Sequence, residues 1–173
     1  MTKIDLKKFI RDIPDFPKKG IVFKDVTTLL KDKDALKAAV DSLAHAFAGK
    51  DIAYVVGIES RGFIFGTALA YTLGVGFIPV RKKGKLPART RTVTYDLEYG
   101  TDTLEIHADA LKEGDKVVII DDLLATGGTV AAAVKLVADA GARIEGVGFI
   151  IELSFLNGRT KLGNLPVFSA IQY

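Results

Sequence analysis

Cysteine and tryptophan are absent from the 173-residue chain, and methionine occurs once. Without cysteine the protein has no disulfide bond, no thiolate nucleophile and no cysteine-ligated metal, and this composition suits a cytoplasmic protein. No apolar run is long enough to span a membrane. The charged opening stretch MTKIDLKKFIRDIPDFPKKG has no apolar core of the kind that secretory signals carry. We therefore expect neither a leader nor a membrane segment.

Two common nucleotide-binding signatures are also missing. No Gly-Lys-Ser or Gly-Lys-Thr of a Walker loop occurs, and neither does the G-x-G-x-x-G dinucleotide fingerprint. The net charge of +3 is too small to indicate nucleic-acid binding. Six of the 24 basic residues nevertheless gather in one stretch that contains no acid. They are Arg81, Lys82, Lys83, Lys85, Arg89 and Arg91. We expect this stretch to face an anion.

Hydrophobic residues make up 49% of the chain, enough for a sizeable core in a single domain that spans residues 1–173. Their spacing predicts helices and strands in alternation. The predicted helices are 3–12, 34–48, 62–73 and 128–140, and the predicted strands are 52–58, 75–80, 116–121, 144–153 and 166–171. Strands that are apolar on both faces indicate an α/β fold, in which helices cover both sides of a mainly parallel sheet.

A polar excursion at residues 81–107 interrupts this alternation. It contains the basic stretch and two short strand-like pieces. Connections of this length are uncommon in compact domains and are usually functional or disordered. We therefore expect residues 81–107 to have a functional role.

The stretch VVIIDDLLATGGT, residues 117–129, places two acids at the end of a predicted strand and two glycines before a predicted helix. Ligands of such sheets bind beyond the carboxyl ends of the strands. The first amides of a helix favour an anion, and Gly127 and Gly128 would let the backbone approach a phosphate. Asp121 and Asp122 would accept hydrogen bonds from sugar hydroxyls. The stretch therefore predicts a ribose 5-phosphate site, although TGGT alone is more typical of an ordinary turn.

The same stretch resembles the phosphoribosyl-diphosphate motif of the type I phosphoribosyltransferases. Further segments resemble the adenine-specific members of this family, in family order. They are DFPKKGIVFKDVTTLL near the start, GIESRGFIFG at 57–66, RKKGKLP at 81–87, YDLEYGTDTLEIH at 95–107 and ELSFLNGR at 152–159. The resemblance implies the type I phosphoribosyltransferase fold, a twisted sheet with a base-binding region at 1–33 and a flexible hood at 81–107.

The activity implied by the resemblance is transfer of the 5-phosphoribosyl group from 5-phosphoribosyl 1-diphosphate to adenine, which gives AMP and diphosphate in purine salvage. The resemblance also implies a cytoplasmic homodimer and a requirement for Mg²⁺. The metal would be held mainly by the substrate diphosphate and waters, with no direct protein ligand. We expect no nucleic-acid or membrane partner.

The resemblance assigns the sugar-phosphate contacts residue by residue. The 5-phosphate would lie on Ala125, Thr126, Gly127, Gly128 and Thr129. Asp121 and Asp122 would hold the ribose hydroxyls. Arg61 would lie in the diphosphate loop, and the diphosphate would also be bound by Arg81, Lys82 and Lys85, partly from the neighbouring subunit. A non-proline cis peptide is implied near Glu59-Ser60.

The base site is assigned in the same way. Backbone groups of Val22, Phe23 and Lys24 would read the adenine edge, with Phe23 stacked on the ring. Lys24 departs from the family, which often has arginine there, and PARTRTV at 87–93 is unusually basic. Glu98 of the hood would take the proton from adenine, with Tyr99 beside it, and Asp96 is the rival base.

Two alternatives stay open from the sequence. The enzyme could use another base, namely hypoxanthine, guanine, xanthine or orotate. The chain could instead be a non-catalytic regulator that senses phosphoribosyl diphosphate and binds nucleic acid through residues 81–91. Such a regulator would be expected to carry an additional DNA-binding element, and it would have no use for Glu98.

Overall fold

The computed structural model describes residues 4–96 and 100–173. Its strands are β1 (Arg11–Pro14), β2 (Val22–Asp25), β3 (Tyr54–Ile58), β4 (Gly76–Lys82), β5 (Thr90–Asp96), β6 (Thr101–His107), β7 (Lys116–Leu124), β8 (Arg143–Glu152) and β9 (Val167–Gln172). Its α-helices are α1 (Thr27–Lys31), α2 (Lys33–Ala46), α3 (Gly62–Leu73) and α4 (Gly128–Asp139). Its 3₁₀ helices are η1 (Leu6–Phe9), η2 (Ser154–Leu156) and η3 (Gly158–Leu162).

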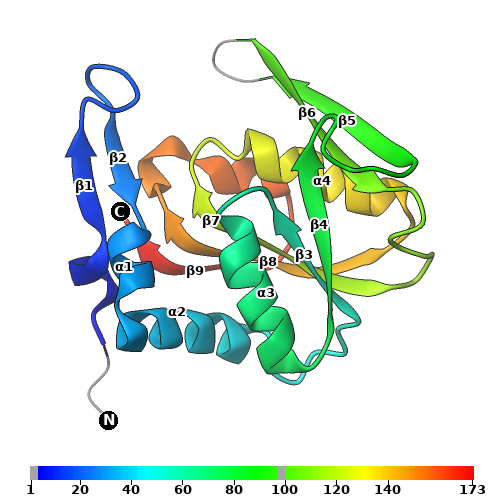
Figure 1. Ribbon diagram of the computed structural model, residues 1–173, viewed down its shortest axis with the longest axis horizontal. Coiled ribbons are helices and arrows are strands. Elements are labelled where there is room, and N and C mark those ends of the chain that lie inside the picture. Colours follow the sequence, from blue (N-terminus) through cyan, green and yellow to red (C-terminus); the bar gives the residue numbers. More distant parts are fainter. Residues whose placement is uncertain (1–3, 97–99) are drawn as a thin grey trace.

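The described residues form a seven-stranded sheet of order β5-β6-β4-β3-β7-β8-β9. The neighbours from β4 to β9 run parallel, whereas β6 pairs antiparallel with both β4 and β5. This mainly parallel sheet confirms the predicted α/β fold. Strands β1 and β2 form a separate antiparallel hairpin. Figure 1 shows the two hairpins, β1–β2 and β5–β6, rising on the side of the molecule where β7 ends.

Alternate side chains of the central strand β7 enter two separate cores. Val117 and Ile119 pack in the core that includes α4, and Val118 and Ile120 pack in the core that includes α2 and α3. All four side chains are fully buried. Burial on both faces explains why this strand is a continuous apolar run in the sequence.

Local signals set the ends of the helices. The Asp32 carboxylate accepts hydrogen bonds from the amides of Asp34 and Ala35 and so caps the start of α2. Gly74 adopts a left-handed conformation directly after α3 and ends it. Helix α3 has the predicted bounds, and α2 and α4 differ from prediction by one or two residues at their ends.

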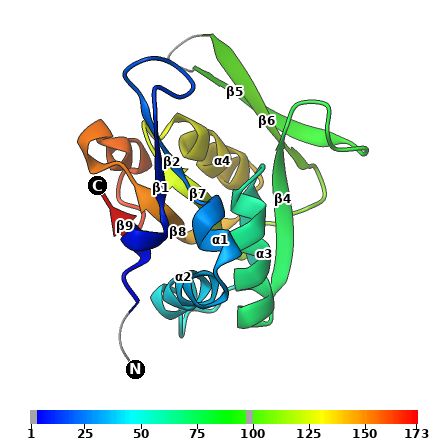
Figure 2. The same ribbon diagram turned by 60° about the vertical axis from the view of Figure 1, so that its left-hand side comes forward.

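The excursion at 81–107 continues the sheet. Strands β5 and β6, which correspond to the two predicted strand-like pieces, pair from Thr90↔His107 to Asp96↔Thr101. The hairpin reaches β4 through the pairs Arg81↔Glu105 and Lys82↔Leu104. Strand β5 lies against α4, as Figure 2 shows from a second side.

Two predicted elements need correction. The helix predicted at 3–12 is wrong, because a 3₁₀ turn at Leu6–Phe9 gives way to extended backbone at Ile10 and then to β1. Pairing with β2, including an ion pair between Arg11 and Asp25, outweighs the weak helical periodicity. The strand predicted at 116–121 continues to Leu124, because its last residues still pair with β8.

Candidate functional site

A cleft of about 660 Å³ lies beyond β3 and β7, between the start of α4 and the β5–β6 hairpin. It is lined by every residue predicted to bind phosphoribosyl diphosphate except Arg81. These residues are Arg61, Lys82, Lys85, Asp121, Asp122, Ala125, Thr126, Gly127, Gly128 and Thr129. The structure thus brings together groups that lie far apart in the sequence, as the parallel-sheet topology requires.

The loop before α4 offers bare backbone to the cleft. Gly127 is the N-cap residue of α4 and has φ of +81°, and no side chain caps the helix there. A Cβ at this position would lie 2.5 Å from the carbonyl oxygen of Gly158, so only glycine fits. At Gly128 a Cβ would meet its nearest atom, the Asp96 carbonyl oxygen, at an ordinary 3.5 Å. The uncapped amides at this helix end can therefore bind an anion.

The two adjacent acids sit deep beside this loop. Asp122 is only 4% exposed, and its Oδ2 lies 2.7 Å from Nε of Arg61. The Asp121 carboxylate accepts a hydrogen bond from the Asp122 amide at 2.8 Å. Burial raises the pKa of Asp121 well above its usual range, and the Asp122 charge adds to this. Burial also raises the pKa of Asp122, against the opposing effect of Arg61. Hydroxyl groups of a ligand would give these carboxylates hydrogen-bond donors.

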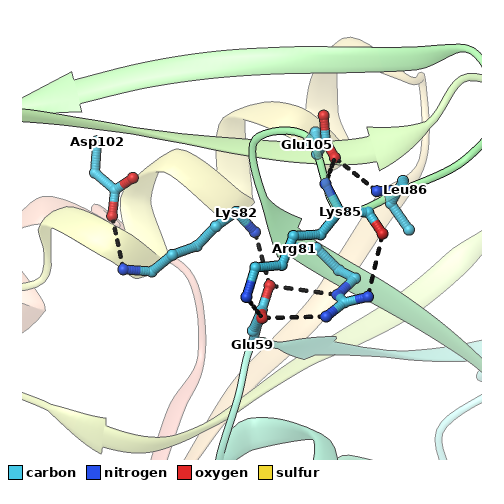
Figure 3. A network of polar contacts seen from close by, with 7 residues as sticks. All are labelled: Glu59, Arg81, Lys82, Lys85, Leu86, Asp102 and Glu105. Atoms are coloured by element: carbon cyan, nitrogen blue, oxygen red, sulfur yellow. Dashed lines mark hydrogen bonds and ion pairs between the residues drawn. The ribbon is translucent and has the colours of Figure 1, made fainter.

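A cluster of basic residues is organised around Glu59, as Figure 3 shows. The Glu59 carboxylate accepts hydrogen bonds from Arg81, from Lys85 Nζ at 3.0 Å and from the Lys82 amide at 2.9 Å. Burial alone would raise the pKa of Glu59, but these hydrogen bonds outweigh it and lower the pKa to about 2. The buried Glu105 accepts hydrogen bonds from the amides of Lys85 and Leu86 and holds the same segment. The Glu59-Ser60 peptide is cis, as predicted.

The hairpin contributes two further groups to the cleft. Asp102 forms an ion pair with Lys82 at 3.1 Å, and the hydrogen bond with Asp102 raises the pKa of Lys82. The Tyr95 hydroxyl lies 3.3 Å from Oγ1 of Thr129 and so connects β5 to the start of α4. Hence each lysine or arginine that lines the described cleft already has a carboxylate partner.

The predicted base-binding residues lie on β2 next to the cleft. The ring centroid of Phe23 is 5.0 Å from the Arg61 guanidinium. Val22 is 48% exposed. The Lys24 ammonium is held by Asp12 at 2.7 Å and lies over the Tyr173 ring. The Lys24 side chain is therefore engaged elsewhere, which leaves the backbone of this residue to meet a ligand.

The structure supports the other predicted site residues less directly. Arg81 does not line the cleft, because its guanidinium binds Glu59 and the Lys85 carbonyl. Glu98 and Tyr99 lie outside the described residues, and Asp96 is exposed. Among residues 4–96 and 100–173, no group of three or more histidine or acidic side chains could hold a metal ion. No helix in these ranges is long and apolar enough to cross a membrane.

Sequence reasoning missed three groups that shape the cleft, namely the Glu59 carboxylate, Tyr95 and Asp102. Glu59 directly precedes Ser60 and Arg61 in the strand-to-helix turn, which is the signal that could have singled it out. Tyr95 and Asp102 are opposite each other in the β5–β6 register. That register depends on pairing across a hairpin whose turn carries no decisive motif.

The chain matches the family model for the phosphoribosyl transferase domain over residues 26–154. Adenine phosphoribosyltransferase of Trichormus variabilis is 58% identical over 172 residues, which cover 98% of this chain and 100% of the relative. The enzyme of that name from Syntrophotalea carbinolica is 59% identical over 169 residues, 98% of this chain and 99% of the relative.

Solved structures agree with these relatives. Adenine phosphoribosyltransferase of Thermoanaerobacter pseudethanolicus superposes with a TM-score of 0.95 at 54% identity and covers 98% of each chain. The Saccharomyces cerevisiae enzyme, solved with adenine and an imino-altritol bisphosphate, gives a TM-score of 0.90 at 45% identity and covers 95% of this chain and 96% of its own.

Proposed function

Because the chain belongs to the phosphoribosyl transferase family, we propose that it transfers the 5-phosphoribosyl group of 5-phosphoribosyl 1-diphosphate to adenine. The products are AMP and diphosphate. The observation that carries this proposal is a single cleft in which an uncapped helix start, an acidic pair and a cation cluster are combined. Relatives that share more than half of their residues with this chain carry the adenine-specific name.

Two parts of the cleft suit the ribose 5-phosphate. Residues 125–129 present backbone amides and the hydroxyls of Thr126 and Thr129 to the phosphate. Asp121 and Asp122 accept hydrogen bonds from the ribose hydroxyls, which offsets the cost of burying the two carboxylates.

The cations at the other part of the cleft suit the diphosphate. Arg61, Lys82 and Lys85 exchange their carboxylate partners for phosphate oxygens, while Arg81 keeps Glu59 in place. Mg²⁺ would be held mainly by the substrate diphosphate and waters, because the described residues include no group of three acidic or histidine side chains that could bind it. When bound with the substrate, Mg²⁺ would supply positive charge that neutralises the diphosphate. No described protein cage is needed for such an ion, because Mg²⁺ keeps several waters.

The chemical step breaks the bond between the anomeric carbon and the diphosphate and forms a bond to N9 of adenine. Positive charge develops on the sugar, as in other glycosyl transfers. The cleft holds sugar and diphosphate, and Phe23 and the β2 backbone hold the base in line. We assign the proton acceptor to Glu98, which takes the proton from N7 of an adenine tautomer as N9 attacks.

We further propose a homodimer. Helix α3 carries two exposed apolar side chains seven residues apart and so on one face, Ile64 and Tyr71, and Tyr71 is 89% exposed. Burial of this face between two subunits would remove it from water. Sedimentation at micromolar concentration tests this, and a monomer under those conditions would contradict it. The cytoplasmic location stays a prediction that rests on the resemblance and on the lack of cysteine.

The activity is tested by incubating the protein with phosphoribosyl diphosphate, Mg²⁺ and one base at a time, followed by identification of the nucleotide. We expect AMP from adenine, with one diphosphate released for each AMP. Absence of any nucleotide would favour a sensing role, and efficient formation of IMP, GMP, XMP or OMP would assign a different base.

A further inference from the structure

Helix η3 is fixed rigidly against the loop that precedes α4. Arg159 in η3 forms a two-point ion pair with the buried Glu152, at 2.6 Å and 2.7 Å, and also donates to the Val167 carbonyl. Leu162 at the end of η3 is 4% exposed and belongs to the core that contains α4. A two-point ion pair to the buried Glu152 carboxylate and a core leucine thus hold η3 at both ends.

Gly158 brings η3 into backbone contact with residues 125–128, the loop that precedes α4. A Cβ at Gly158 would collide with the Ala125 carbonyl oxygen and would approach the Gly127 nitrogen to 3.1 Å. The position of η3 relative to residues 125–128 is therefore set by direct contact between two stretches of backbone.

Lys161 lies between Arg159 and Leu162 in η3, and its side chain extends toward the start of α4. Its Nζ is 4.0 Å from the point that a Cβ at Gly128 would occupy. Tyr95 Cδ2 and the Asp96 carbonyl oxygen approach the same point to 3.7 Å and 3.5 Å. The ammonium group, the end of β5 and the first residue of α4 therefore converge at one place.

The charge balance there favours a role for this lysine. Asp121 and Asp122 bring negative charge close to the loop, and the described cation nearest to them, Arg61, is already paired with Asp122. The Lys161 side chain is exposed and has no hydrogen bond or ion pair with any other described residue. A phosphate on residues 125–129 would carry up to two negative charges and would need a cation that the acidic pair does not occupy.

We propose that Lys161 binds the 5-phosphate of the substrate, as a cation supplied from outside the loop motif. This inference rests on the proposed function, which places the phosphate on that loop. Its ammonium group lies next to the first residue of α4 and contributes charge that the neutral loop lacks. The diphosphate end of the cleft lies on other residues and does not depend on it.

The test compares ribose 5-phosphate with inorganic diphosphate plus Mg²⁺ as separate ligands in calorimetric titrations. Lys161→Ala should weaken ribose 5-phosphate binding about tenfold, equivalent to about 1.4 kcal/mol, and leave diphosphate binding unchanged. Lys161→Arg keeps the charge and should remain within about threefold of the wild type. Lys135 is an exposed lysine on α4 that pairs with Asp139, and Lys135→Ala is the control that should change neither affinity.

Two results would overturn the proposal. One is wild-type affinity of Lys161→Ala for ribose 5-phosphate. The other is an equal loss for both ligands, which would indicate a general structural change; melting curves of each variant identify that case. If the wild type makes AMP and Lys161→Ala matches it in both titrations, only the inference on Lys161 fails. If the wild type makes no nucleotide, the proposed function fails first.

Discussion

At the residue scale, the adjacent residues Gly127 and Gly128 lack a side chain for different reasons. Gly127 has a positive φ, and a Cβ there would collide with the Gly158 carbonyl oxygen, so its lack of a side chain is a requirement of the fold. Gly128 lies in the first turn of α4 with ordinary space around a hypothetical Cβ. The missing side chain at Gly128 therefore leaves room for a ligand that approaches from the cleft.

We predict that Gly128→Val abolishes measurable phosphoribosyl diphosphate binding and costs the fold only about 1 kcal/mol. Gly127→Val should cost about 2–4 kcal/mol, because it combines an unfavourable φ with a backbone collision. Urea unfolding and ligand titration of both variants measure the two effects. Tight binding by a well-folded Gly128→Val protein would move the phosphate site elsewhere.

The ionisation of Glu59 and that of Asp121 should change the free energy of unfolding with pH in opposite directions. The pKa of Glu59 in the fold is about 2, below its ordinary 4.5, so its ionised form stabilises the protein above pH 4.5 and this stabilisation is lost as the pH falls toward 2. The destabilisation caused by Glu59→Gln should therefore be largest at neutral pH and shrink below pH 4.5. Asp121 has a raised pKa, so Asp121→Asn should stabilise at neutral pH. Urea unfolding at several pH values measures both, and a pH-independent effect of Glu59→Gln would contradict the assignment.

Proton transfer is the third prediction at this scale. Glu98→Gln keeps the size of the side chain and removes the base, so the rate of the chemical step should fall by about 10²- to 10⁴-fold while phosphoribosyl diphosphate affinity stays nearly unchanged. Asp96→Asn is the matched variant and should have a smaller effect. Single-turnover kinetics separate chemistry from product release. A large loss confined to Asp96→Asn would transfer the role to Asp96.

At the scale of elements, the sequence predicts the framework better than the segments that close the site. Helix α3 and the buried strands follow from apolar periodicity and from glycine stops, because each is determined by local pattern and burial. The structure of residues 3–12 does not follow from the local pattern, because β1 pairs with β2, which lies further along the chain. The motif at 117–129 predicts the loop before α4, whereas the position of Lys161 near that loop depends on the anchoring of η3.

The basic segment after β4 should be protected by its ligand. Lys82 and Lys85 are about half exposed and are paired with Asp102 and Glu59, and phosphate oxygens would replace these pairs with stronger ones. We predict that trypsin cuts within residues 82–91 and that phosphoribosyl diphosphate with Mg²⁺ slows this cleavage. Cleavage after the exposed Lys112, remote from the cleft, serves as the internal reference. Equal cleavage rates at 82–91 with and without ligand would contradict binding of the ligand by this segment.

At the scale of the whole molecule, one edge of a parallel sheet gathers groups of complementary chemistry. The loop before α4, the acids of β7 and the cations near Glu59 line one cleft, and we propose that they bind the phosphate, the ribose and the diphosphate respectively. The β1–β2 hairpin brings Phe23 beside Arg61, which in the proposed complex would place the base next to the sugar. We propose that specificity for adenine rests on the β2 backbone, whose donors and acceptors would match the amino group and N1 of adenine. A 6-oxo base would leave buried hydrogen-bonding groups of the site without partners, and enzymes discriminate strongly against such substrates.

Competition among bases tests this central claim most directly. Equal concentrations of adenine, hypoxanthine and guanine are supplied together with limiting phosphoribosyl diphosphate and Mg²⁺, and the nucleotides formed are quantified by chromatography. The ratio of products then reports the ratio of kcat/KM values for the bases. We predict that AMP exceeds IMP and GMP by at least about a hundredfold. IMP or GMP in amounts comparable to AMP would contradict the account.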